Sequence, residues 1–185
     1  MTSASSTLIG IKVGGDILRN KSTLGAVCQD VASLVGDGSR VFMVHGGGPQ
    51  STALQKELGQ APNVVAGRRI TDAAALDVIK MAVAGKLNVD LCSALINAGA
   101  SPVGLHGASS QAIAANKRPP RVVSGGGDEP IDFGFVGDVV GVNNDLLSCL
   151  FDGGYVPVLA CVGADSSGQV FNINADVIAN QAAKH

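Results

Sequence analysis

Apolar positions along the chain change repeatedly from a strand-like to a helix-like spacing. The runs at residues 7–13 and 41–44 are almost continuously apolar, as in strands that are covered on both faces. Residues 24–35 carry apolar side chains at helical spacing, and the glycines at 36 and 38 are expected to end that helix. Pro49 fits the first turn of a second helix. This order predicts an α/β fold, with an open and mostly parallel sheet sandwiched by helices.

The rest of the chain predicts further strands and helices without a linker or an internal repeat. We expect an extended segment at 64–70, a short central strand at 103–105, a polar segment at 111–127, a twisted β-ribbon at 133–142 and a buried strand at 156–162. Asn143 or Asn144 is expected to cap the helix that precedes the last of these strands. We therefore treat residues 1–185 as one domain.

A long helix is expected in the middle of the chain. Thr71 or Asp72 can cap its start, and its apolar stripe reaches about Ala98. Gly85 interrupts the stripe at a cost of ~1 kcal/mol relative to alanine. A helix tolerates such a glycine where something packs closely against it. We favour a contact between two subunits over a contact inside one subunit.

Composition and charge exclude several classes of protein. Hydrophobic residues make up 46% of the chain and charged residues only 15%, which argues against disorder. The formal net charge is −2 and aromatic residues are 3%, so neither a basic face nor stacking aromatics favour nucleic-acid binding. The start at residues 1–6 is polar, and no signal peptide or membrane span is evident, so we expect a cytoplasmic protein. The four cysteines lie in apolar runs and are interpreted as small buried residues.

Two glycine-rich loops follow the first two predicted strands. They read Lys12-Val13-Gly14-Gly15 and His45-Gly46-Gly47-Gly48-Pro49. Parallel strands place both loops at the same rim of the sheet, where backbone N–H groups can bind an anion. We therefore predict one phosphoryl-binding site, and we favour a role toward its ligand for Lys12 over a lysine that merely reaches solvent. His45 is interpreted as a packed histidine that holds its loop rather than as a base. Neither the P-loop motif nor the dinucleotide-binding motif is present.

Two later segments add polar groups. Arg68 and Arg69 precede a helix start, where a guanidinium can bind a carboxylate with two hydrogen bonds, although a surface pair is plausible for Arg68. Asn172, Asn174 and Asp176 lie at a turn from strand to helix. Taken alone, Asn174 is interpreted as a helix cap and Asp176 as a partner of the helix dipole.

Together these motifs resemble the amino acid kinase family. The order is the lysine-glycine loop, HGGGPQ, GRRITD, AVAGKLN and NINAD, and the likeness runs from about Ile9 to Lys184. HGGGPQ and NINAD with the arginine between them resemble the branch of the family whose acceptor is N-acetyl-L-glutamate. Aspartate, uridylate and carbamate kinases share the lysine-glycine opening but differ at the later motifs.

The resemblance implies transfer of the γ-phosphoryl group of ATP, with Mg²⁺, to the side-chain carboxylate of N-acetyl-L-glutamate. The product would be an acyl phosphate of arginine biosynthesis. By the same analogy Lys12 neutralises charge on the transferred group and Asp176 orients the catalytic lysines. Arg69 and Asn172 hold the α-carboxylate end, and backbone N–H groups come from Gly14, Gly15, Gly47 and Gly48. No residue of this chain is assigned to a metal.

The resemblance also implies a part that this chain does not contain. The family has a carboxyl-terminal half with the adenine site and a second catalytic lysine, and Lys184 does not match that lysine. We therefore expect an amino-terminal acceptor-binding and dimerisation domain that is inactive by itself. The short polar start favours a homodimer without arginine control, formed through the helix with Gly85. A kinase for another acylated amino acid, such as acetylaminoadipate, and a non-catalytic binding or dimerisation module remain alternatives.

Overall fold

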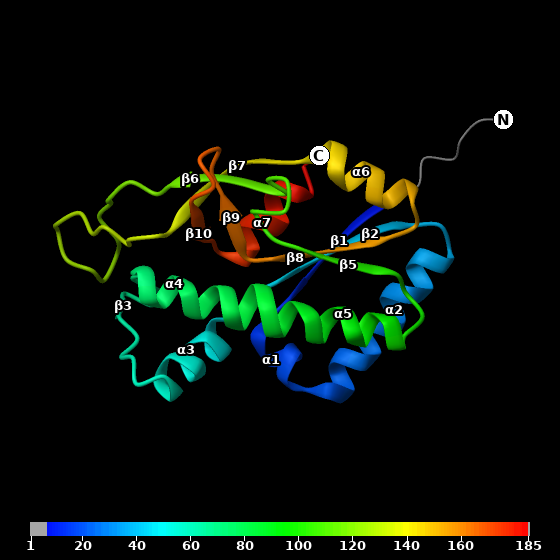
Figure 1. Ribbon diagram of the computed structural model, residues 1–185, viewed down its shortest axis with the longest axis horizontal. Helices are drawn as coiled ribbons and strands as arrows, with labels where there is room; N and C mark the ends of the chain where they lie inside the picture. The colour runs from blue at the N-terminus through cyan, green and yellow to red at the C-terminus, as the bar shows by residue number, and fades with distance from the viewer. Residues whose placement is uncertain (1–6, 185) are drawn as a thin grey trace.

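The core of the protein is a four-stranded parallel sheet. The computed structural model describes residues 7–184, so the polar start at residues 1–6 lies outside the described residues. The strands, in spatial order, are β1 (Leu8–Val13), β2 (Arg40–His45), β8 (Val156–Ala160) and β5 (Pro102–Leu105) (Figure 1). β1 and β2 pair in parallel from Leu8 opposite Arg40 to Val13 opposite His45. The two strands therefore end side by side, and both glycine loops leave the sheet at one rim.

Helices cover both faces of this sheet, which confirms the predicted sandwich. One face carries α2 (Lys21–Gly36) and α5 (Asn88–Asn97), and the other carries α6 (Asn144–Asp152) and α7 (Ala175–Ala182). In β2, Val41 and Met43 pack with α2 and α5, whereas Phe42 and Val44 pack with α6 and α7. Because successive side chains of a strand point to opposite faces, a strand between two helical layers is apolar at every position.

A second, mixed sheet lies beyond the carboxyl end of β8. Its strands, in order, are β10 (Val170–Asn172), β9 (Val162–Ala164), β6 (Ile113–Lys117) and β7 (Gly137–Val142). The predicted strand at 156–162 is therefore two strands that separate at Cys161. The polar segment at 111–127 contains β6, which the sequence did not predict. The predicted ribbon at 133–142 is a strand only in its second half, where β7 pairs with β6 in antiparallel orientation.

The glycine loops each lead into a helix. The first loop opens α1 (Gly15–Arg19), a short helix that the sequence did not predict, and Asn20 then caps α2 by accepting the N–H of Thr23. The second loop opens α3 (Gly48–Glu57), with Pro49 in its first turn as predicted. Both helices start at the rim where the parallel strands end.

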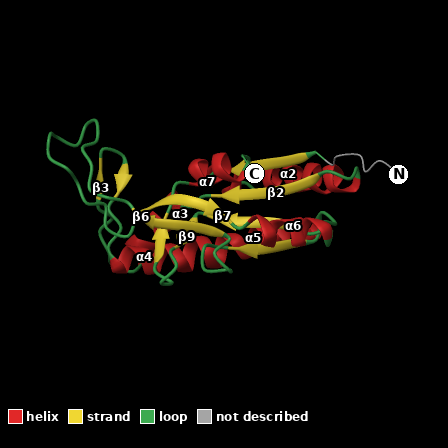
Figure 2. Ribbon diagram, turned by 90° about the horizontal axis from the view of Figure 1, so that it is seen from above, coloured by secondary structure: helices red, strands yellow, loops and turns green. Residues whose placement is uncertain are grey.

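The segment after α3 is a hairpin rather than a single extended stretch. β3 (Val64–Val65) and β4 (Arg68–Arg69) pair in antiparallel orientation around a turn at Ala66 and Gly67. Both turn residues have left-handed backbones, with φ of 50° and 74°, which is the geometry of a tight hairpin turn. Figure 2 shows this hairpin at one end of the molecule.

The predicted long helix is present and is continuous through three segments. They are α4 (Ala73–Ile79), the π-helical stretch η1 (Lys80–Leu87) and α5. Asp72 caps the start by accepting the N–H of Ala75. A Cβ built on Gly85 meets only the Lys80 carbonyl oxygen of the same helix, at 3.5 Å. Within the described residues, no other element therefore packs against Gly85. None of the described helices is long and apolar enough to cross a membrane.

Candidate anion-binding site at the rim of the sheet

An ion pair lies where β1 ends. Lys12 is the penultimate residue of β1, and its Nζ lies 3.0 Å from Oδ1 of Asp176 in the first turn of α7. Asn174 caps that helix by accepting the N–H of Asp176, as the sequence predicted. The Lys12 and Asp176 side chains are 36% and 62% exposed, so a ligand can reach both. Asp176 therefore contacts Lys12 in addition to lying at the positive end of the helix dipole.

The two glycine loops are joined by hydrogen bonds. The N–H of Gly46 donates to the carbonyl oxygen of Val13 at 3.3 Å. Gln50 Nε2 donates to the carbonyl oxygen of Gly15 at 2.9 Å, from the first turn of α3 across to the first turn of α1. Sequence reasoning gave Gln50 no role, although it closes the HGGGPQ motif. The loops thus meet at the rim, as predicted.

His45 is a buried residue that supports the second loop. Its Nε2 lies 3.0 Å from Asn88 Nδ2, and its Nδ1 lies 3.0 Å from the Gly46 carbonyl oxygen. An amide nitrogen only donates, so Nε2 accepts and Nδ1–H donates to Gly46. Burial lowers the pKa of His45, which favours this neutral form. The structure therefore confirms the packed histidine and adds Asn88, which also donates to the Val158 carbonyl oxygen at 3.0 Å.

Gly47 brings its loop into close contact with the long helix. A Cβ built there lies 2.5 Å from Leu87 Cδ1 and 2.8 Å from Val83 Cγ2, so a side chain does not fit without rearrangement. Gly48, the first residue of α3, and Gly14, just before α1, both have open space at the Cβ position. Internal packing therefore requires a glycine at position 47 but not at these two positions.

Arg69 is held by the acceptors of α3. Its Nη2 donates to Thr52 Oγ1 at 2.5 Å and to the Gly48 carbonyl oxygen at 3.3 Å, and its Nη1 donates to Gln55 Oε1. Burial lowers the pKa of the Arg69 guanidinium, but an arginine remains charged at neutral pH. The neighbouring Arg68 is exposed. The hairpin thus directs one arginine inward and one to solvent.

A cavity of about 310 Å³ lies between Arg69 and the start of α3. Its polar wall is formed by Gly48, Ser51, Thr52, Arg69 and Asn172. Asn172, at the end of β10, donates from Nδ2 to Thr71 Oγ1 at 3.1 Å, which fixes its amide beside the cavity. Of the residues predicted to bind substrate, Gly48, Arg69 and Asn172 therefore share one cavity.

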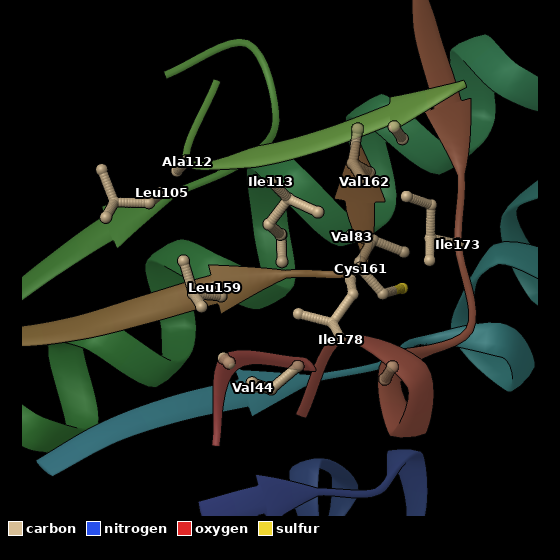
Figure 3. Packing of buried hydrophobic residues seen from close by; sticks show 14 of the residues in the cluster. Val44, Val83, Leu105, Ala112, Ile113, Leu159, Cys161, Val162, Ile173 and Ile178 are labelled. Atoms are coloured by element: carbon tan, nitrogen blue, oxygen red, sulfur yellow. The ribbon is translucent and has the colours of Figure 1, made fainter. Parts of the chain in front are cut away.

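Cys161 forms an apolar part of the cavity wall. Figure 3 shows it among the buried side chains of the core cluster that includes Val83 and Ile178. Burial raises the pKa of this thiol to about 11, whereas the nearby positive charge of Lys12 acts in the opposite direction. The thiol is therefore neutral at physiological pH. Lys12 and Asp176 are not among the residues that line this cavity. The prediction that all four cysteines are buried holds for Cys28 and Cys161; Cys92 is only partly buried, and for Cys149, which is exposed, the prediction is wrong.

The structure thus places two glycine loops and a lysine at one rim of a parallel α/β sheet, with an arginine-lined cavity beside the second loop. The model of the amino acid kinase family matches residues 8–185, and the chain belongs to that family. It is 55% identical over 183 residues to acetylglutamate kinase of Sorangium cellulosum and 57% identical over 175 residues to that of Anaeromyxobacter sp. strain K. These alignments cover 99% and 95% of this chain but only 64% of each relative.

Solved structures show the same fold. The smu.665 protein of Streptococcus mutans matches with a TM-score of 0.78 and 25% identity, over 95% of this chain and 67% of that one. N-acetylglutamate synthase from Neisseria gonorrhoeae, complexed with coenzyme A and N-acetyl-glutamate, matches with a TM-score of 0.75 and 23% identity. That match covers 96% of this chain and 38% of the synthase, and it supports the fold alone.

Replacing Gly47 with alanine tests the fit of the second loop. We expect Gly47→Ala to lower the free energy of unfolding by roughly 1–3 kcal/mol, because the added methyl group overlaps Leu87 and Val83. Gly25→Ala in α2 is the matched control, since a Cβ there meets nothing within 4 Å; a helical alanine should stabilise by up to about 1 kcal/mol. Urea unfolding measures both. Wild-type stability of Gly47→Ala would show that the loop does not pack as described.

Proposed function

We propose that this chain forms the acceptor-binding part of a kinase that phosphorylates the side-chain carboxylate of N-acetyl-L-glutamate. The phosphoryl donor is MgATP, and the product is an acyl phosphate of arginine biosynthesis. The observation that carries the proposal is the cavity in which Arg69, Asn172 and the start of α3 converge. Family membership and the names of the relatives at 55% and 57% identity support the same acceptor.

The cavity suits a small anionic acceptor. Its volume of about 310 Å³ is at the lower end of small-ligand sites. In the proposal, Arg69 and the Asn172 amide bind the α-carboxylate, because a hydrogen bond from a guanidinium to a carboxylate is strengthened by both charges. The N–H groups of Gly47 and Gly48 face the acceptor at the positive end of α3.

Lys12 and the first glycine loop form the proposed phosphoryl side. Phosphoryl transfer needs little covalent chemistry from the protein, and most of its catalysis is positioning and charge stabilisation. Lys12 Nζ would stabilise negative charge on the transferred group, with Asp176 holding the ammonium in place at 3.0 Å. The N–H groups of Gly14 and Gly15 would bind the same group from the side of α1.

The nucleotide side is assigned to a further segment. This chain spans 64% of the length of its relatives, and we propose that the remaining length in them supplies the adenine site and a second lysine. The described residues contain no group of three His, Cys, Asp or Glu side chains that could hold a metal. In the proposal Mg²⁺ enters with the nucleotide, because Mg²⁺ is usually bound by substrate phosphates and water with only one or two carboxylates. The 185-residue chain alone is then expected to bind acceptor without efficient turnover.

Two other functions can be distinguished from this one by measuring which acceptor the chain binds. A kinase for acetylaminoadipate would have a cavity that prefers an acceptor with one more methylene group. A non-catalytic binding or dimerisation module would bind neither acceptor at this cavity. Titration calorimetry with N-acetyl-L-glutamate and with N-acetyl-L-2-aminoadipate separates the three, and the proposal requires tighter binding of the shorter ligand.

The Arg69 side chain should determine acceptor affinity. We expect Arg69→Gln to raise the Kd for N-acetyl-L-glutamate by tenfold or more, because a hydrogen bond to a charged group contributes roughly 1.5–3 kcal/mol. Arg68→Gln is the matched control on the same strand, and its exposed side chain should leave the Kd within about twofold of wild type. Calorimetry measures both. Equal effects of the two substitutions would remove Arg69 from the carboxylate site.

We also propose that the long helix forms a homodimer contact. Met81, Val89 and Ile96 are 51%, 64% and 65% exposed, and their spacing of eight and seven residues places them along one side of the helix. Gly85 lies between the first two, and no other described element packs on it. A second copy of this helix would cover the stripe and approach closely at the glycine.

A charge on this stripe should dissociate the dimer. Wild type is expected to have a solution mass of twice 18.5 kDa, and Val89→Asp the mass of one chain. Val140→Asp is the control, because Val140 is similarly exposed, at 61%, but lies on β7. Sedimentation velocity distinguishes these outcomes. A monomeric wild type, or dissociation by Val140→Asp alone, would contradict this contact.

A further inference from the structure

Ser51 has a buried hydroxyl that the protein does not satisfy. It lies in the first turn of α3 and lines the cavity that also contains Arg69 and Asn172. The residue is only 1% exposed, and its Oγ has no hydrogen-bond partner among the residues that the structure describes. Buried polar atoms in proteins are almost always paired, because an unmade hydrogen bond costs free energy.

The usual partner of a helical serine is present but unused. A serine or threonine in a helix can donate to the carbonyl oxygen four residues earlier. Thr52 does so toward the Gly48 carbonyl oxygen at 3.0 Å, and Ser33 does so toward that of Gln29 at 3.0 Å. The corresponding oxygen for Ser51 is that of Gly47, which accepts only the backbone N–H of Ser51, at 2.8 Å. The Ser51 hydroxyl is thus left for a group from outside the helix.

The other polar side chains that line the cavity with Ser51 are already engaged. Thr52 Oγ1 donates to Gly48 and accepts from Arg69, and Gln55 accepts from the same guanidinium. The Asn172 amide donates to Thr71 Oγ1. Within the described part of the cavity wall, Ser51 is therefore the residue with a buried oxygen that still lacks a partner.

We propose that Ser51 is an acceptor-binding residue whose hydroxyl donates to the carboxylate that Arg69 binds. This inference rests on the proposed function and extends it by one specificity-determining residue. Ser51 is next to Thr52 on α3, and Thr52 contacts the Arg69 guanidinium at 2.5 Å. A carboxylate has about four lone-pair sites, so it can accept from the guanidinium and from the hydroxyl together. A hydrogen bond to an ionised acceptor is stronger than a neutral one, which favours acidic over neutral ligands.

Ser51→Ala tests the assignment in the 185-residue chain. Calorimetry with N-acetyl-L-glutamate should show a Kd raised roughly tenfold, the size expected for a lost hydrogen bond to a charged group. The melting temperature without ligand should stay the same or rise, because the substitution removes a hydroxyl that makes no bond in the free protein. Ser33→Ala is the matched control, since it removes a helical serine hydroxyl far along the chain from the cavity. Its Kd should equal that of wild type.

A second pair of variants tests which ligand group Ser51 contacts. Arg69→Lys keeps the charge but loses the fork that positions the carboxylate. On that background Ser51→Ala should weaken binding by less than threefold, because both residues act on one carboxylate and their effects are not additive. A full tenfold loss on both backgrounds would overturn the assignment to that carboxylate.

The outcomes separate this inference from the function on which it rests. If wild type and Ser33→Ala bind N-acetyl-L-glutamate and Ser51→Ala binds equally well, the Ser51 proposal is wrong and the acceptor site stands. If Ser51→Ala also melts at a lower temperature with unchanged Kd, the hydroxyl has a structural role instead. If wild type shows no binding, the proposed function itself fails.

Discussion

Parallel pairing of β1 with β2 fixes the position of every group at the rim. The pairing runs without a break from Leu8 opposite Arg40 to Val13 opposite His45. Since both strands end at the same level, the glycines that follow them meet, and α1 and α3 start next to each other. A shift of one residue would move Lys12 to the other face of the sheet, away from Asp176. The candidate site therefore depends on the register of these two strands.

The rim keeps its shape because buried groups hold the second loop. His45 and Asn88 form a hydrogen-bonded pair behind the loop, and Gly47 packs against Leu87 and Val83 where a larger residue does not fit. Gln50 joins this loop to the first one. These contacts leave the loops little freedom, which suits a site that acts by positioning and charge stabilisation.

The sequence was most informative where local chemistry determines structure. The continuously apolar run at 41–44 predicts a strand with two covered faces. Three helices are capped by the side chains of Asp72, Asn143 and Asn174. The rim position of Lys12 and the glycine loops also followed, because strand order alone places them there. The family that the order of the motifs predicted is the one whose model matches residues 8–185.

The features that the sequence did not predict depend on contacts between distant segments. β6 lies in a polar stretch and is a strand because β7 and β9 pair with it on its two sides. The break at Cys161 depends on the same second sheet. The β3–β4 turn needs left-handed backbones at Ala66 and Gly67, and this pair is a weak turn signal. Ser51 was missed because a serine in the first turn of a helix is usually exposed, and its burial becomes evident only once the hairpin and β10 close the cavity.

The central claim is that this rim is one acceptor site, and amide shifts in NMR spectra of the ¹⁵N-labelled chain test it most directly. On titration with N-acetyl-L-glutamate, the largest shift changes should fall on the backbone amides of Gly47, Gly48, Arg69 and Asn172. These residues come from three segments that are far apart in sequence and meet at this rim. Changes concentrated on another surface, with these four amides unaffected, would contradict the account.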